Sequence, residues 1–184
     1  DGGIIIHSDG SESKRFNVLE GQRITLWHRA GFDSAIISGR DTPATNIRAE
    51  QIGIKYVLQG FKQKLPAFER LLKDTGYSAQ QAAYIGDDWL DLPLLRRVGF
   101  AAVVQNGGEE IRPYAHYVTR RPGGDGAVAE VIEYILKQTG RWDKLSTTMR
   151  VVNLSGATAI FTNAAEGTNT VWLFSVDDDD DRLS

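Results

Sequence analysis

The sequence predicts an α/β fold in which a doubly wound parallel sheet is covered by helices on both faces and carries a β-hairpin extension. Two observations lead to this prediction. Short apolar segments alternate with helical segments of about ten residues along most of the chain. Several of the apolar segments lack polar alternation, as strands covered on both faces do. Alternation of this kind builds right-handed β-α-β units, and these produce a parallel sheet.

The composition indicates a single domain over residues 1–184. The chain has 184 residues, of which 41% are hydrophobic and 24% charged, and its formal net charge is −3. No long basic stretch is present, so we do not expect nucleic acid as a partner. Cysteine is absent, which excludes disulfides and thiolate metal sites. No apolar run approaches the roughly 18 residues that a membrane span needs, so we expect a cytoplasmic protein without a membrane partner.

The first part of the chain predicts a hairpin followed by alternating helices and strands. The turn Ser8-Asp9-Gly10-Ser11 lies between two strand-like runs, which predicts a β-hairpin over residues 4–18. We then expect a helix over 19–30, a strand over 32–37, a helix over 43–51, a strand over 56–58 and an amphipathic helix over 62–75. Gly31 and Gly76 follow the first and last of these helices, as C-terminal capping glycines do.

The second part continues the alternation and then changes. We expect a strand over 82–85, a helix over 90–98, a strand over 100–104, a helix from Glu109, a short strand over 116–118 and a helix over 127–138. Beyond Gly140 the apolar runs 151–154, 158–162 and 170–176 predict strands separated by Ser-Gly and Glu-Gly turns.

Three carboxylates follow the apolar run 82–85, in the loop Gly86-Asp87-Asp88-Trp89-Leu90-Asp91. Ligands of open α/β sheets lie beyond the carboxyl ends of the strands, so these acids stand where chemistry is expected. Oxygen-rich clusters attract Mg²⁺, which prefers hard ligands. The alternative is that this turn only caps the next helix, with Asp88 as the N-cap residue.

A second acidic run, residues 177–181, follows the predicted strand 170–176. Five consecutive Asp residues are usually a solvated tail, but they can also be acids delivered by a buried strand. The only methionine is Met149. Its position indicates either that the chain order is a rotation of a chain that began there, or that the chain is processed or tag-trimmed.

Four strand ends therefore carry reactive groups: Ser38-Gly39-Arg40, Lys64 after Gly60, Asp87-Asp88, and the terminal Asp run. This combination resembles the haloacid dehalogenase superfamily of phosphohydrolases. More narrowly, residues 1–140 resemble the capless family of 3-deoxy-D-manno-octulosonate 8-phosphate phosphatases. The segments that carry this resemblance are residues 2–7, Glu12-x-Lys14-x-Phe16-Asn17, Ile36-Ile37-Ser38-Gly39-Arg40, Gln59-Gly60-x-Lys62-x-Lys64-Leu65, residues 83–93 and Pro122-Gly123-Gly124-Asp125-Gly126-Ala127.

The sequence departs from this family in the place of the nucleophile motif, which in the family stands directly before the segment that here begins at Asp1. Joining Ser184 to Asp1 gives Asp178-Asp179-Asp180-Asp181-Arg182-Leu183-Ser184-Asp1-Gly2, which is similar to the family pattern DxDGxL(S/T)DG. We therefore expect residues 170–181 to be the central catalytic strand with its nucleophile motif. Asp181 replaces the Gly of the family and Glu20 its usual Asp, and the register Asp177/Asp179 stays open beside Asp178/Asp180.

The resemblance implies a role for each candidate residue. Asp178 would attack phosphorus and form an aspartyl-phosphate, while Asp180 would act as general acid and base. Mg²⁺ would be held by Asp178, Asp180 (through its carbonyl) and Asp87, with Asp88 and Asp91 as supporting groups. Ser38 would donate a hydrogen bond to a phosphoryl oxygen, and Lys64 would neutralise charge. Gly39 and Arg40 would bind the substrate, since a guanidinium suits the carboxylate of a sugar acid.

The expected function is thus a Mg²⁺-dependent phosphatase for a sugar-acid phosphate, with 3-deoxy-D-manno-octulosonate 8-phosphate as the first candidate. A phosphomutase or a phosphatase for a related nine-carbon sugar acid is an alternative with the same site. A non-catalytic oligomeric module is the alternative if the Asp run is only a tail. Because no inserted domain covers the site, the resemblance implies a homotetramer in which hairpins pair and a neighbouring subunit closes the pocket.

Overall fold

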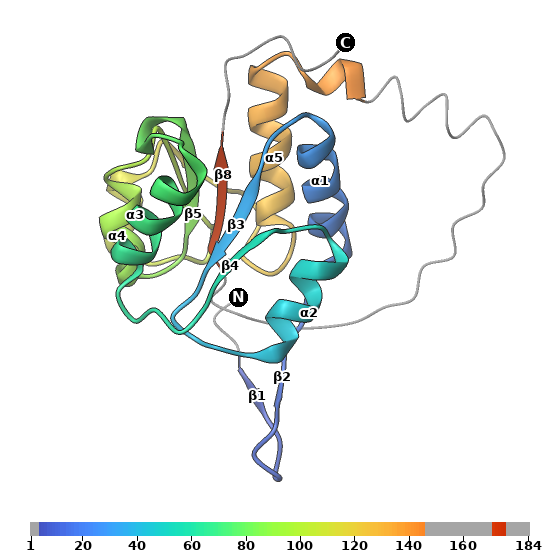
Figure 1. Ribbon diagram of the computed structural model, residues 1–184, viewed down its shortest axis with the longest axis vertical. Coiled ribbons are helices and arrows are strands. Elements are labelled where there is room, and N and C mark those ends of the chain that lie inside the picture. The colour runs from blue at the N-terminus through green and yellow to red at the C-terminus, as the bar shows by residue number, and fades with distance from the viewer. Residues whose placement is uncertain (1–3, 146–170, 176–184) are drawn as a thin grey trace, which may run out of the picture.

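The computed structural model describes residues 4–145 and 171–175, and these form a three-layer α/β domain with a projecting hairpin (Figure 1). The six-stranded sheet has the order β4-β3-β8-β5-β6-β7. Its strands are β3 (Ser34–Ile37), β4 (Tyr56–Leu58), β5 (Ala82–Gly86), β6 (Phe100–Val103), β7 (Tyr117–Val118) and β8 (Val171–Ser175). The expected fold class is confirmed.

Helices cover both faces of this sheet. They are α1 (Val18–Arg29), α2 (Pro43–Gln51), α3 (Lys64–Thr75), α4 (Leu92–Leu95) and α5 (Ala127–Gln138). Figure 1 shows α1 and α5 on one face and α3 and α4 on the other. The hydrophobic core is divided accordingly, with one cluster under α1 and α5 and a second under α3 and α4.

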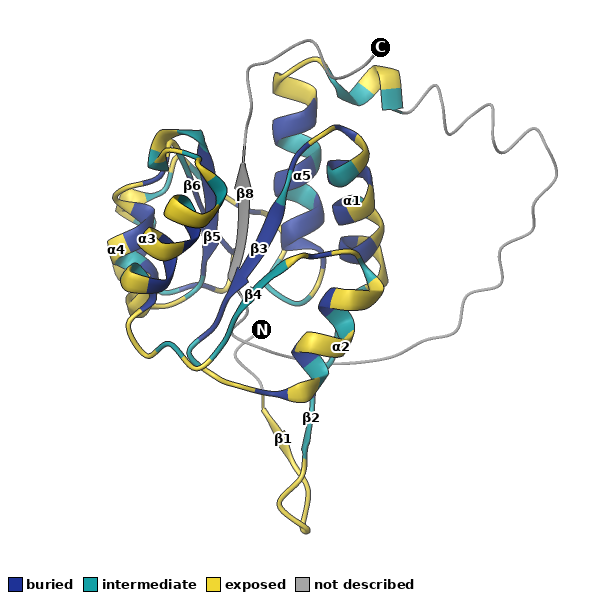
Figure 2. Ribbon diagram, viewed as in Figure 1, coloured by how far each residue is buried: buried dark blue, intermediate teal, exposed yellow. Residues whose placement is uncertain are grey.

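Strands β3 and β5 are buried along their whole length, as the apolar runs predict. Because side chains alternate between the two faces of a strand, Ile36 and Ile85 pack under α1 and α5 while Ile37 and Tyr84 pack under α3 and α4. Figure 2 shows the dark blue, buried faces of α1 and α5 turned toward the sheet. The same alternation will place the hydroxyl group of Tyr84 beside the site described below.

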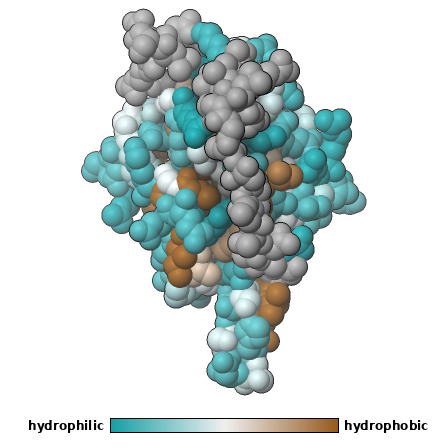
Figure 3. Space-filling model, turned by 90° about the vertical axis from the view of Figure 1, so that its right-hand side faces the viewer, coloured by the Kyte–Doolittle hydropathy of each residue, from teal (hydrophilic) through white to brown (hydrophobic). Residues whose placement is uncertain are grey.

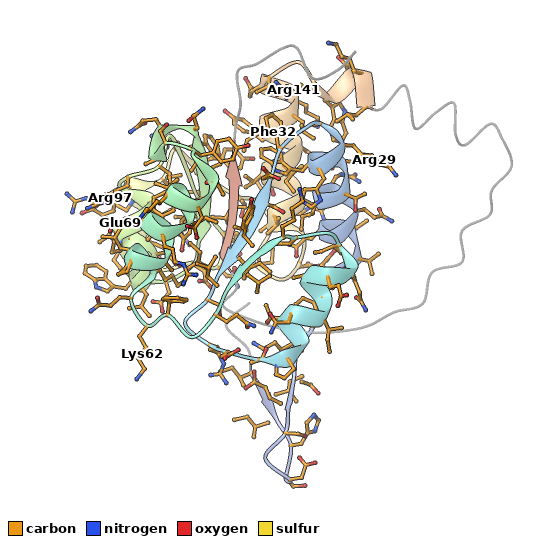
Figure 4. All side chains as sticks on the ribbon, in the orientation of Figure 1. Arg29, Phe32, Lys62, Glu69, Arg97 and Arg141 are labelled. Atoms are coloured by element: carbon orange, nitrogen blue, oxygen red, sulfur yellow. The ribbon has the colours of Figure 1, made fainter. Side chains whose placement is uncertain are left out.

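The aromatic residues at the start of β3 fix helix α1 and the chain after α5. The buried Trp27 of α1 stacks on Phe32, with ring centroids 4.2 Å apart, and its Nε1 donates to the carbonyl of Asp33 at 2.7 Å. Arg141 lies over the ring of Phe32, with its Cζ 4.5 Å from the ring centroid (Figure 4). These contacts hold α1, β3 and the segment after α5 together at one edge of the sheet.

Two expected helices are shorter or tighter than the sequence suggested. The helix expected over 90–98 is a 3₁₀ turn, η2 (Trp89–Asp91), followed by the single turn of α4. The helix expected from Glu109 is the 3₁₀ segment η3 (Glu109–Tyr114), which contains Pro113. Proline has no amide hydrogen and its ring clashes with the preceding turn, so a regular α-helix is disfavoured there. A third 3₁₀ turn, η1 (Ala79–Gln81), leads into β5.

The hairpin is present but short. Strands β1 (Ile5–Ile6) and β2 (Glu12–Ser13) pair antiparallel, with Ile5 opposite Ser13. The hairpin projects from the lower edge of the domain in Figure 1. Its paired region is therefore narrower than the run 4–18 that the sequence predicted.

Strand β8 fills the centre of the sheet, but it runs antiparallel to both of its neighbours. Val171 lies beside Ile37 at the end of β3, and Ser175 lies beside Ala82 at the start of β5. The expectation of a parallel central strand is therefore wrong for the described residues. The chain leaves β8 at the edge opposite the Gly86 loop. The segment 146–170 before it is long enough for the chain to reach either edge, so topology alone does not fix the direction of β8.

Several expected features lie outside the described residues. They are the strands over 151–154 and 158–162, Met149, Asp177, Asp178, Asp179, Asp180, and the joined motif around Ser184 and Asp1. In residues 4–145 and 171–175, no helix is both long enough and apolar enough to cross a membrane.

Candidate active site

Three of the residues predicted for phosphate chemistry, Ser38, Lys64 and Asp87, lie at the carboxyl edge of the sheet. Strands β3 and β5 are both antiparallel to β8 and hence parallel to each other, so both end at the same edge. Ser38 directly follows β3 and Asp87 directly follows β5. Lys64 is the first residue of α3, which packs on this part of the sheet. This edge is the lower one in Figure 1.

Asp91 is the centre of a buried network at this edge. Its side chain has no exposed surface, and both of its carboxylate oxygens accept hydrogen bonds. Oδ1 accepts from the ammonium of Lys64 and, at 2.7 Å, from the hydroxyl of Tyr84. Oδ2 accepts from the backbone amides of Asp87 at 2.9 Å and Asp88 at 3.1 Å. Asp91 therefore fixes both the lysine and the acidic loop.

Gly86 makes this arrangement possible. A Cβ atom at position 86 would lie 2.6 Å from the Cβ of Asp91, closer than carbon atoms approach. The absence of a side chain there lets Asp91 fold back under the loop. Asp88 begins η2 by accepting from the amide of Trp89 at 2.6 Å, which is the capping role that the alternative interpretation of this turn gave it. Asp87 remains the acid of the loop that has no such structural role.

The pKa of Asp87 is raised to about 6. Burial is the main cause and the negative charge of Asp91 adds to it, while Lys64 opposes the shift. A carboxylate in such surroundings is short of positive charge, and carboxylate oxygens are the ligands that Mg²⁺ takes in proteins. The donor chemistry of Asp87 thus fits a divalent ion. Within residues 4–145 and 171–175, however, no three acidic or histidine side chains gather into a metal site, so further ligands would have to come from elsewhere.

Ser38 is buried and belongs to the turn after β3. Its Oγ accepts a hydrogen bond from the amide of Arg40 at 3.1 Å, and it leaves the hydroxyl proton available for donation. The N-cap of α2 is Thr42, so Ser38 does not cap that helix. Gly39 lies between Ser38 and Arg40 in the same turn. A Cβ atom added at position 39 would lie 3.7 Å from the carbonyl oxygen of Phe61.

Arg40 is connected to the hairpin through Glu12. Its Nη2 lies 2.5 Å from Oε2 of Glu12, whose other oxygen lies 3.3 Å from Nζ of the buried Lys14. Two cations thus share one carboxylate, and the cluster keeps a net positive charge beside the turn of Ser38. The hydrogen bond from Arg40 is the main reason that the pKa of Glu12 lies below its usual value. Sequence reasoning named Glu12 only as part of the family resemblance and missed its contact with Arg40, because the two residues lie 28 positions apart.

The glycine-rich segment 120–126 is anchored to the edge of the site along its length. Glu130 of α5 accepts from the amides of Arg120 and Arg121, each at 3.0 Å. Asn106 accepts from the amide of Gly123 at 2.7 Å. These contacts make the segment a fixed wall. No local sequence pattern marks Glu130 and Asn106 as its anchors.

Glu20 holds the far end of the same wall. Its Oε1 accepts from the amides of Gly126 at 3.1 Å and Val128 at 3.2 Å at the start of α5. Burial raises the pKa of Glu20, although these two hydrogen bonds oppose the shift. Glu20, which stands where the family usually has Asp, thus uses its longer side chain to join α1 to the first turn of α5.

The known proteins that this chain resembles include phosphatases. A sequence profile described as haloacid dehalogenase-like hydrolase matches residues 35–132. The 3-deoxy-D-manno-octulosonate 8-phosphate phosphatase of Yersinia pestis is 41% identical over 136 residues, which cover 74% of this chain and 73% of the relative.

Solved structures agree with this. The same enzyme from Moraxella catarrhalis, in complex with magnesium, phosphate and a KDO molecule, has a TM-score of 0.79 at 40% identity, covering 81% of this chain and 86% of the other. The cobalt-bound phosphatase from Haemophilus influenzae has a TM-score of 0.73 at 34% identity, covering 76% and 82%.

Proposed function

Since this chain belongs to the haloacid dehalogenase-like hydrolases, we propose that it hydrolyses a sugar-acid phosphate with the help of Mg²⁺, and that 3-deoxy-D-manno-octulosonate 8-phosphate is its substrate. Its enzyme class is phosphoric monoester hydrolase. The observation that carries the proposal is the meeting of Ser38, Lys64 and Asp87 at one edge of the sheet. A phosphatase with magnesium, phosphate and sugar acid bound is 40% identical to this chain, which supports the choice of substrate.

The described residues explain how the phosphate group would be held. A phosphate monoester is a dianion that repels an attacking carboxylate, so positive charge and hydrogen-bond donors are needed around its oxygens. The hydroxyl of Ser38 and the ammonium of Lys64 supply these groups. Asp87 would hold the metal ion, and Mg²⁺ when bound would neutralise charge on the phosphoryl oxygens.

We assign the covalent steps to Asp178 and Asp180. A carboxylate oxygen of Asp178 attacks phosphorus, the bond to the sugar oxygen breaks, and Asp180 protonates that oxygen. Asp180 then takes a proton from a water molecule that attacks phosphorus, which releases inorganic phosphate and restores Asp178. These roles require the chain after residue 175 to emerge at the edge of Asp87. The antiparallel register of β8 opposes them, because Ser175 lies beside Ala82 at the other edge.

The carboxylate of the substrate would bind to Arg40, next to Gly39. The net positive charge that Arg40 and Lys14 keep after pairing with Glu12 suits an anionic sugar. The same chemistry would accept a nine-carbon sugar acid, which is the second candidate substrate.

We also propose that the chain forms a homotetramer through its hairpins. Ile4, Ile5 and Ile6 are exposed by 48%, 41% and 71%. Figure 3 shows hydrophobic side chains gathered on the hairpin at the bottom of the view. Large apolar side chains that are exposed next to each other favour burial in an interface.

The test is phosphate release from 3-deoxy-D-manno-octulosonate 8-phosphate with Mg²⁺ and with a chelator. We expect activity only with the metal, and its loss in Asp87→Asn. Asp74→Asn, which removes an exposed carboxylate at the far end of α3, is the matched control and should keep activity. Wild-type protein that releases no phosphate from any sugar-acid phosphate would overturn the proposal and leave the non-catalytic oligomer as the better reading.

Asp178→Asn and Asp180→Asn test the covalent roles separately. Loss of activity in both variants would mean that the strand of residues 170–176 runs parallel to β3 in the active enzyme. Full activity in both would exclude these acids as nucleophile and acid, while the phosphatase function would stand.

A further inference from the structure

Tyr84 places a hydroxyl group inside the site network, although it lies in the middle of an apolar strand. Its ring is fully buried among the side chains under α3 and α4. Its hydroxyl donates to Oδ1 of Asp91 at 2.7 Å, the same oxygen that accepts from Lys64. A phenylalanine would fill this space equally well, so packing alone does not explain the hydroxyl.

We propose that Tyr84 is a positioning residue, whose hydroxyl sets the orientation of the Asp91 carboxylate and thereby the places of Lys64 and of the Asp87-Asp88 backbone. The inference rests on the proposed function. It adds a group to the site that touches neither substrate nor metal and acts only through Asp91.

The geometry gives the reason. A carboxylate can rotate about its bond to Cβ, and the two amides on Oδ2 of Asp91 change their distance when it does. Lysine has a flexible stem and cannot hold the carboxylate in one orientation by itself. The hydroxyl of Tyr84 comes from the rigid strand β5 and reaches Oδ1 from a fixed direction. It is therefore the one donor to Oδ1 that restricts this rotation.

The hydroxyl also shares the negative charge of Oδ1. Without it, the full charge of that oxygen faces the ammonium of Lys64, which would be drawn closer to Asp91. The remaining N–H groups of Lys64 would then be aimed less well at a phosphoryl oxygen. We therefore expect the loss of the hydroxyl to affect turnover and metal binding more than substrate affinity.

The experiment compares Tyr84→Phe with Tyr77→Phe in the full chain. The hydroxyl of Tyr77 also donates to a carboxylate, Oδ2 of Asp33 at 3.3 Å, but at the opposite edge of the sheet. Three experiments are made: Mg²⁺ affinity is measured by calorimetry, hydrogen exchange of the Asp87 and Asp88 amides is measured without metal, and phosphate release gives kcat and KM.

For Tyr84→Phe we expect about tenfold lower kcat, a KM within twofold of wild type, several-fold weaker Mg²⁺ binding and faster exchange of the two amides. Tyr77→Phe should match wild type in all of these. Both variants keep their rings, so both should fold, and circular dichroism verifies this.

Wild-type values for kcat, Mg²⁺ affinity and amide exchange in a folded Tyr84→Phe would overturn the inference and leave the phosphatase function intact. Wild-type protein that binds Mg²⁺ without releasing phosphate would refute the function. In that case weaker Mg²⁺ binding in Tyr84→Phe would still support the orientation of Asp91 by Tyr84, and unchanged binding would overturn it. Absence of both Mg²⁺ binding and phosphate release in the wild type would refute both.

Discussion

Replacing Asp91 by asparagine should destabilise the protein strongly, because it leaves the ammonium of Lys64 buried without a counter-charge. The side chains of Lys64 and Asp91 are only 4% and 0% exposed, so water cannot compensate for the lost charge. Removing one partner of a buried ion pair costs about 3–5 kcal/mol. For a domain of this size each kcal/mol lowers the melting temperature by about 2–4 °C, so we expect a decrease of roughly 6–20 °C.

A double-mutant cycle separates the lost pair from the other effects of the substitution. The free energy of unfolding is measured by urea denaturation at pH 7.5 for wild type, Asp91→Asn, Lys64→Met and the double variant. The double variant buries no unpaired charge. We therefore expect its loss of stability to be at least about 2 kcal/mol smaller than the sum of the losses in the two single variants.

The exposed pair Arg97–Glu69 is the matched control. Like the buried pair it joins α3 to the segment around α4 (Figure 4), with 2.8 Å between Nη1 and Oε1. Its side chains are 51% and 56% exposed, so the same cycle there should give a coupling of about 0.2–1 kcal/mol. If Asp91→Asn costs less than about 1 kcal/mol, or if the two cycles give equal coupling, the pair does not stabilise the site as argued.

Two further predictions concern the wall and the hairpin. Burial disfavours the ionised form of Glu130, but hydrogen bonds from Arg120, Tyr117 and Arg121 together hold the pKa of Glu130 below 4.5. The ionised carboxylate therefore stabilises the folded protein fully above pH 4.5, and this stabilisation is lost as the pH falls through the lower pKa of the folded state. The free energy of unfolding of Glu130→Gln should therefore be about 1–2 kcal/mol lower than that of wild type at pH 7. This difference, measured by urea denaturation, should become smaller as the pH is lowered toward 3. Glu12→Gln removes the carboxylate that holds the Arg40 guanidinium in place, and we expect this loss of orientation to outweigh the gain in positive charge, so the KM for a sugar-acid phosphate should rise about threefold at unchanged kcat.

Each of these has a control on the same element. Glu133→Gln removes a half-buried carboxylate of α5 that pairs with Arg23 of α1, and the stability difference from wild type should vary less with pH than that of Glu130→Gln. If the loss of stability in Glu130→Gln does not change with pH, the charge of Glu130 does not stabilise the segment 120–126 as argued. Ser13→Ala leaves the Glu12 pairs in place and should keep the wild-type KM, and an equal KM in Glu12→Gln would show that Arg40 needs no partner.

The sequence was sufficient to predict that Ser38 and Asp87 lie at one edge of the sheet, whereas the predicted Asp178 and Asp180 lie outside the described residues. Ser38 and Asp87 each follow an apolar run that lacks polar alternation, and the ends of such strands meet at one edge of the sheet. The two helices that were overestimated failed for local reasons, since Pro113 interrupts one and the turn of Asp88 to Asp91 replaces the start of the other.

The contacts that organise the site could not be predicted in this way. Tyr84 looks like any aromatic residue of a buried strand, and its bond to Asp91 depends on how the loop folds back across Gly86. The link from Glu12 to Arg40 depends on where the hairpin lies relative to the turn after β3. Such contacts arise from the three-dimensional arrangement of separate elements, and no spacing in the chain records them.

The sequence of β8 favours a buried strand but does not fix the direction in which that strand runs. Its residues Val171-Trp172-Leu173-Phe174-Ser175 are apolar from the first to the fourth, so the string has nearly the same character forwards and backwards. Backbone donors and acceptors also pair in either orientation, with only a slight difference in stability. The segment can thus pair with its neighbouring strands in either direction, whereas reactivity depends on which end emerges beside the bound phosphate. The direction of the central strand is therefore a separate requirement for catalysis. Formation of a complete sheet does not by itself ensure the right direction.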